Sequence, residues 1–175
     1  MQWEHQSAEE RHSVTVTKGG KPIPGLRSDR ISSVDEEVMC WRKANHIHAW
    51  FVANVQDGSD DMRDYYVTSD KLRELLDVCE KVIKASKLVD GTVDGGTVYD
   101  KEHPNGLKQR LPGQVIEDST VAEKLLPTQP GFFFGSYEYD EWYLNDVVET
   151  REWILRMLAE HEQVGFADLV YSSSW

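Results

Sequence analysis

The chain has 175 residues, which is enough for one domain with a sizeable apolar core. Hydrophobic residues make up 39% of the chain, a share that excludes a wholly disordered protein. The formal net charge of −12 repels phosphate backbones, so we predict no direct binding to nucleic acid. No apolar run approaches the roughly 20 residues that span a bilayer. The N-terminus also lacks a signal-peptide pattern, and we expect a cytosolic protein without membrane contact.

Composition separates the beginning of the chain from the rest. Residues 1–30 carry four acids and five bases, whereas residues 31–175 carry 27 acids and 14 bases. Gly and Pro between residues 18 and 25 interrupt regular structure. The alternation of residues 13–17 indicates one short edge strand before them. We therefore predict a flexible N-terminal segment, 1–30, and a single globular domain, 31–175.

Two long helices are predicted in the first half of the domain. The first covers about residues 33–56, with Ser32 or Ser33 as its cap and a wide apolar face. The second covers about residues 70–86, with Ser69 as its cap. Cys40 and Cys79 fall on the apolar faces of these helices, so we expect both to be buried free thiols.

The second half of the domain gives shorter signals. Residues 65–67 and 164–171 are predicted as strands, and residues 119–126 and 140–161 as helices. Residues 89–99 are interpreted as a β-hairpin that turns at Asp94-Gly95, although a mobile loop fits the same Gly-rich composition.

These elements predict an α+β fold with three main helices and a small, mostly antiparallel sheet. Phe132-Phe133-Phe134 indicates a buried strand or a tight turn. The residues expected in the core are Ile47, Phe51, Leu76, Phe133 and Ile154.

The chain contains no cofactor fingerprint, metal-ligand spacing or nucleophile motif, so we predict no catalytic residue, metal or cofactor. His46 and His48 are two residues apart on a helix and point about 200° away from each other, which prevents a shared metal. Asn45 and His48 share a helical face. They form either a polar pair in the core or the floor of a pocket with Arg42 near its rim.

Aromatic and acidic residues gather where the last predicted helix begins. Acids at a helix start stabilise the helix dipole, while Tyr and Trp are enriched in interaction hot spots. Arg42 either pairs with Asp140 or Glu141 or contributes to a binding surface with the tyrosines. The predicted binding residues are Arg42, Asn45, His48, Tyr137, Tyr139, Asp140 and Glu141.

Two unusual motifs carry a resemblance. They read VMCWRKANHIHAWFV at 38–52 and LLPTQPGFFFGS at 125–136, and residues 54–58, 65–67 and 139–143 add shorter matches in the same order. Together they resemble a family of small uncharacterised proteins encoded by tailed bacteriophages, over roughly residues 22–158. The resemblance implies a viral origin and expression in the cytoplasm of a bacterial host. It implies no activity, so no catalytic residue is carried over.

Three functional hypotheses remain. The first is a non-catalytic phage accessory protein that binds a host or phage protein through its acidic, aromatic surface. The second is a small-ligand binder, for example of a phosphate-bearing molecule, with Asn45 and His48 in its pocket. The third is a metal-dependent phosphoryl-transfer enzyme that uses Glu138, Asp140 and Glu141. The first fits the composition best, and the sequence leaves the oligomeric state open.

Overall fold

The computed structural model describes residues 15–27, 30–31, 33–129, 136–164 and 168–173. The chain divides into two compact units, Met1–Cys40 and Trp41–Trp175, which we describe separately. The sequence places this boundary earlier, at residue 30. In the first unit, β1 (Thr17–Lys18) pairs with β2 (Lys21–Pro22) in an antiparallel hairpin. Gly19 and Gly20 form its turn with positive φ angles, a conformation that glycine adopts without steric cost.

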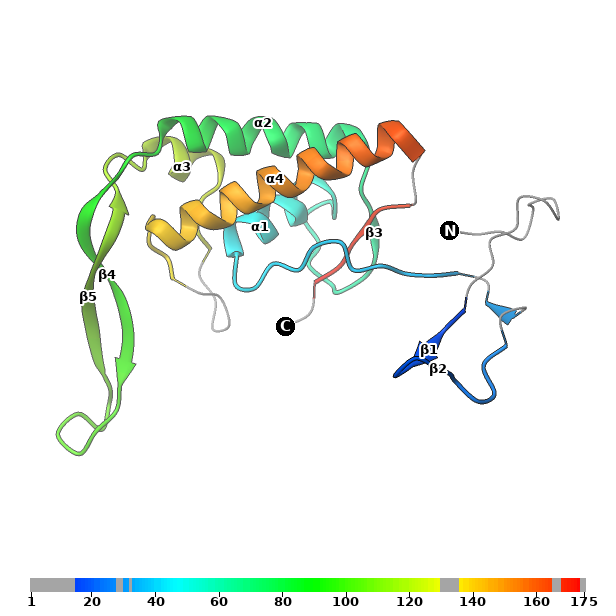
Figure 1. Ribbon diagram of the computed structural model, residues 1–175. Coiled ribbons are helices and arrows are strands. Elements are labelled where there is room, and N and C mark those ends of the chain that lie inside the picture. The colour runs from blue at the N-terminus through cyan, green and yellow to red at the C-terminus, as the bar shows by residue number, and fades with distance from the viewer. Residues whose placement is uncertain (1–14, 28–29, 32, 130–135, 165–167, 174–175) are drawn as a thin grey trace. The chain divides into compact units, whose positions relative to one another are not determined.

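Helices make up the body of the second unit (Figure 1). They are α1 (Asn45–Asn54), α2 (Ser69–Ala85), α3 (Thr120–Leu125) and α4 (Glu141–Val164). The two longest, α2 and α4, pack along each other, and α3 packs on α2. The apolar stripe of α2 supplies Leu72, Leu75, Cys79 and Val82 to the core, as its helical spacing predicts.

The strands of the second unit form two separate antiparallel pairs. The short β3 (Tyr65–Tyr66) pairs with β6 (Val170–Tyr171). The long β4 (Leu88–Val98) pairs with β5 (Leu107–Ile116), and Figure 1 shows this hairpin projecting away from the helices. We call β4 and β5, with the residues between them, the hairpin arm. The α+β class is therefore confirmed, but the described residues form three two-stranded sheets rather than one.

An aromatic cluster closes the core between α1, α4 and β6. Phe51 stacks on Tyr171 with ring centres 4.0 Å apart, and Trp41 meets the edge of Trp153 at 5.1 Å. The Trp41 indole also donates a hydrogen bond to Thr150 Oγ1 at 2.8 Å. Because these rings come from distant parts of the sequence, they fix α1 and β6 against α4.

The expected core residues are largely confirmed. Ile47, Phe51 and Ile154 are at most 1% exposed. Leu76 is only half-buried, because it lies at the edge of the α2 stripe. Phe133 lies outside the described residues, as does the whole Phe132–Phe134 run.

The first predicted helix is too long. The helix begins at Asn45, and residues 33–44 are not helical. Lys43 has φ of 64°, a left-handed conformation that stops a helix from extending backwards through it. Trp41 turns instead into the aromatic cluster. Cys40 is consequently exposed, contrary to expectation, whereas Cys79 is buried as predicted.

Two local predictions also need correction. The cap of α2 is Thr68 rather than Ser69, since Thr68 Oγ1 accepts a hydrogen bond from Lys71 N. Asp94-Gly95 is not a hairpin turn, because β4 continues through it with a register shift between Asp94 and Thr97. Gly96, with φ of 85°, provides the positive angle that this irregularity needs.

The aromatic cluster gives the first testable prediction. Phe51→Ala should lower the free energy of unfolding by about 3–5 kcal/mol, because it removes a fully buried ring and its stacking on Tyr171. Urea unfolding followed by Trp fluorescence measures the loss. Phe51→Leu, which keeps most of the volume, should cost much less. Equal small losses for both variants would show that the ring is not packed as described.

Candidate functional site

Asp140 fixes where α4 begins. Its Oδ1 accepts a hydrogen bond from Tyr143 N at 2.9 Å, which satisfies one of the free amides of the first turn. The residue is only 2% exposed. Burial raises the pKa of its carboxyl group, while hydrogen bonds from the backbone of Tyr143 and Trp142 act in the opposite direction. Asp140 is therefore a buried cap and does not belong to an exposed binding surface.

The residues just before this cap join the root of the hairpin arm. Ile116 N donates to Tyr139 O at 2.8 Å, and Val115 forms an antiparallel bridge with Asp140. The chain thus makes a single bridge to the edge of β5. Because the same backbone leads directly into α4, the arm and the helix share one joint.

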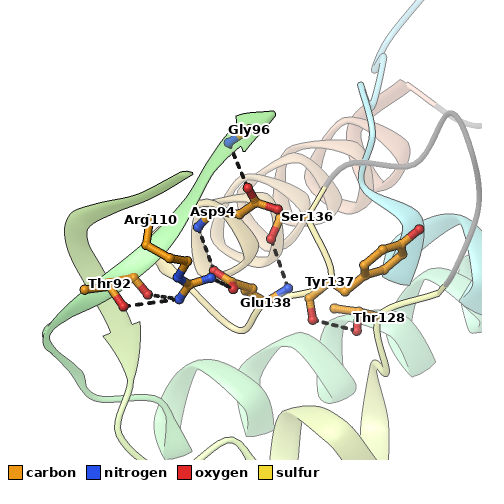
Figure 2. Close-up of polar contacts among 8 residues, drawn as sticks. All are labelled: Thr92, Asp94, Gly96, Arg110, Thr128, Ser136, Tyr137 and Glu138. Carbon is orange, nitrogen blue, oxygen red and sulfur yellow. Dashed lines mark hydrogen bonds and ion pairs between the residues drawn. The ribbon is translucent and has the colours of Figure 1, made fainter. Parts of the chain in front are cut away.

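Glu138 braces the arm further out (Figure 2). Its carboxylate pairs with the Arg110 guanidinium and accepts a hydrogen bond from Asp94 N at 2.9 Å. Arg110 also donates to Thr92 O, so one cation connects β5, β4 and the segment before α4. These charge-assisted hydrogen bonds hold the arm at its irregular point, near Asp94.

Asn45 holds the opposite side of this joint. Its Oδ1 accepts from Gln129 N at 2.8 Å, and its Nδ2 donates to Ser136 O at 3.3 Å. Thr128 makes two further hydrogen bonds to the same segment, to the Tyr139 hydroxyl group and to Tyr137 O. The buried amide of Asn45 therefore connects the backbone at Gln129 to the backbone at Ser136.

His48 points to a different place. Its Nδ1 lies 2.7 Å from the Tyr171 hydroxyl group, and its Nε2 lies 3.2 Å from Asp60 Oδ2. An Asp–His–hydroxyl chain is the arrangement that activates a nucleophile. However, burial, then the charge of Asp60, raises the pKa of the Tyr171 phenol, so its hydroxyl group stays protonated. These contacts attach β6 to α1.

Among the described residues, Asn45 and His48 therefore lie in separate hydrogen-bond networks. Within the same residues, Arg42 is exposed and forms no ion pair with Asp140 or Glu141. Glu138 pairs with Arg110 and Asp140 caps α4, so these carboxylates do not converge. No group of three or more His, Cys, Asp or Glu among the described residues is placed to hold a metal ion.

Exposed aromatic and aliphatic side chains surround the joint and continue along the arm. Tyr137 and Trp142, on either side of the Asp140 cap, are 52% and 68% exposed. On the arm, Tyr99 is 71% exposed. The other exposed apolar residues of the arm are Val98, Leu107 and Leu111. We call the set Val98, Tyr99, Leu107, Leu111, Tyr137 and Trp142 the apolar arm surface.

Sequence reasoning identified part of this site. It selected Tyr137 and did not include Trp142 among the predicted binding residues. It missed Arg110, whose partners are 18 and 28 residues away in the chain. One signal in the sequence could have predicted the arm. Residues 88–98 and 107–116 both contain apolar residues, and the short segment between them permits a long hairpin.

Comparison with protein-family models, curated proteins and solved structures gives no match to this chain. Among the described residues, no helix is both long enough and apolar enough to cross a bilayer.

The Asp140 cap can be tested by substitution. Asp140→Ala should lower the free energy of unfolding by about 1–2 kcal/mol, because it removes the acceptor for Tyr143 N. Asp140→Asn keeps an acceptor oxygen and should cost less. Chemical denaturation of the two variants beside the wild type provides the measurement. If Ala and Asn are equally destabilising, the cap is not what holds the start of α4.

Two titratable groups, the buried His46 and the partly exposed Asp146, contribute to the acid response. Burial lowers the pKa of His46 to about 3, and its ring packs 4.3 Å from Tyr143. The unfolded chain binds this proton below about pH 6.5, so the folded state loses up to about 1.4 kcal/mol per pH unit from there towards pH 3. Burial, then repulsion from Glu149 and Asp140, raises the pKa of Asp146 to about 6. The folded state therefore binds a proton at Asp146 first, which stabilises it as the pH falls from about 6 to 4.

Asp146→Asn removes the second effect and leaves the first. We expect the variant to be more stable than the wild type at pH 7 by about 1 kcal/mol, after allowance for the partial exposure of this carboxylate. Between pH 6 and pH 4 its stability should fall more steeply. Urea unfolding at each pH measures both curves. Parallel curves would show that the Asp146 carboxyl group has an ordinary pKa.

Proposed function

We propose that this chain is a non-catalytic accessory protein of a tailed bacteriophage that binds a host or phage protein in the cytoplasm of the bacterial host. The observation that supports this proposal is the apolar arm surface. A projecting two-stranded hairpin is marginally stable in water by itself, and this one keeps Tyr99 and three aliphatic side chains exposed. Covering such exposed apolar side chains with a partner contributes favourable binding free energy.

The bracing of the arm supports the same function. Arg110, Glu138 and the Tyr139 backbone hold the hairpin against the start of α4 before any partner arrives. A pre-organised arm loses less conformational entropy on binding than a mobile loop. Glu138, Asp140 and Asn45 therefore serve binding indirectly, by positioning the exposed residues around them.

The charge of the protein indicates the kind of partner. Glu141 is exposed beside Trp142, and the chain carries a net charge of −12. A partner with a basic rim around an apolar centre would complement this surface and would be attracted to it over a distance. The viral origin comes from the family resemblance of the two sequence motifs.

A pair of double variants tests the proposal. Tyr99→Ser with Leu107→Ser removes apolar area from the arm, and Glu141→Lys with Trp142→Ser alters the start of α4. Each should weaken partner binding by about 2 kcal/mol or more, roughly 30-fold, because exposed aromatics act as anchors. Tagged protein is captured from infected cells, the partner is identified by mass spectrometry, and affinities are then measured with the purified pair.

The matched control is Met62→Ser with Tyr66→Ser, which removes two exposed side chains, one on β3 and one just before it. It should leave affinity unchanged. Circular dichroism and thermal unfolding establish that all three variants are folded. If the control variant loses the partner and the other two retain it, the interface lies near β3 and the arm is not the binding element.

A further inference from the structure

A groove between α2 and α3 is lined by basic and apolar side chains. Lys81, Lys84 and Ala85 of α2 face Val121, Lys124 and Leu125 of α3 across a groove of about 650 Å³ that is open to solvent. Three of its lining residues are lysines and none is an acid. In a chain whose acids outnumber its bases by 31 to 19, this local reversal of charge stands out.

The floor of the groove is apolar. Ala85, Val121 and Leu125 contribute the side chains between the lysines, and the methylene stems of the lysines add to them. Lys81 pairs with Asp77, but Lys84 and Lys124 are exposed and form no ion pair with described residues. An occupant that supplies both carboxylates and apolar side chains would complement these two ammonium groups and the apolar floor.

The groove lies at the root of the hairpin arm, opposite in charge to the rest of the chain. Ala85 is followed closely by β4, and β5 is followed closely by α3, so both walls continue into the arm. A nucleic acid would meet the same lysines, but it has no apolar side chains for the floor and is repelled by the net charge of −12.

We propose that this groove binds an acidic peptide segment of a partner protein, with apolar side chains on the floor and carboxylates against Lys84 and Lys124. The site is separate from the apolar arm surface and does not depend on it. It gives the protein a second contact of opposite charge preference. A partner that presents both a basic surface and an acidic segment would engage both sites, which raises the overall affinity through effective concentration.

The test uses the full chain and a fluorescein-labelled peptide that alternates pairs of Leu and Glu. Fluorescence anisotropy should show binding that weakens as salt is added, because exposed ion pairs are screened. Lys84→Glu with Lys124→Glu should weaken binding about tenfold or more. Lys84→Gln with Lys124→Gln should have a smaller effect in the same direction. A peptide with Lys in place of Glu should not bind.

The matched control is Lys18→Glu with Lys21→Glu, which makes the same change in net charge on the β1–β2 hairpin and should leave binding unchanged. The Tyr99→Ser, Leu107→Ser variant should also retain the peptide, which separates this site from the arm. Absence of peptide binding, or equal losses in the groove and control variants, would overturn the proposal. Binding of dodecanoate but not of the peptide, with that binding lost in the Lys84→Glu, Lys124→Glu variant, would also overturn the proposal. It would identify a site for small anionic amphiphiles.

Discussion

The capped start of α4 is the joint on which the rest of the second unit depends. Asp140 connects β5 to α4. Its side chain accepts a hydrogen bond from the first turn of α4, while its backbone forms a bridge with β5. A carboxylate that is 2% exposed would be costly without these amide donors. Since α4 packs along α2, and α2 leads into β4, the position of Asp140 fixes the hairpin arm relative to the helices from both ends.

Several polar groups inside the body connect its structural elements. Asn45 connects two backbone segments, and His48 connects α1 to β6 through Tyr171. His46 is kept neutral by burial, and its Nε2 has no hydrogen-bond partner among the described residues. Such a group costs free energy when buried, and the packing of its ring on Tyr143 offsets part of this cost. These polar groups therefore make their contacts inside the body, while the surface presents charged and apolar side chains.

The exposed features divide into two sets with opposite preferences. The apolar arm surface, with Glu141 beside it, suits a partner that is apolar with a basic rim. The groove between α2 and α3 suits acidic peptide. Both are held by ordered backbone, the arm through Arg110 and Glu138 and the groove by the packing of two helices. Under the two proposals, these pre-organised surfaces would serve to join partners.

The sequence by itself determined the class and most of the helical core. The 3.6-residue spacing of Leu72, Leu75 and Cys79 predicts a buried stripe, and local sequence places both ends of α2 and the start of α4 within one residue, whereas α4 continues three residues beyond its predicted end. These features depend on neighbours along the chain. Whether Cys40 and Trp41 are buried or exposed does not depend on such neighbours. Their periodicity wrongly predicted that α1 includes them.

Only the tertiary structure decided how the site is assembled. Trp41 leaves the helical path because it finds Trp153 and Thr150, more than a hundred residues later. Asp94-Gly95 has the composition of a turn, yet β4 continues through it because Arg110 and Glu138 support the strand there. Asp140 carries the charge of a surface residue and becomes a buried cap because β5 covers it. In each case, a contact between residues distant in sequence outweighs the local preference, and local pattern contains no record of such contacts.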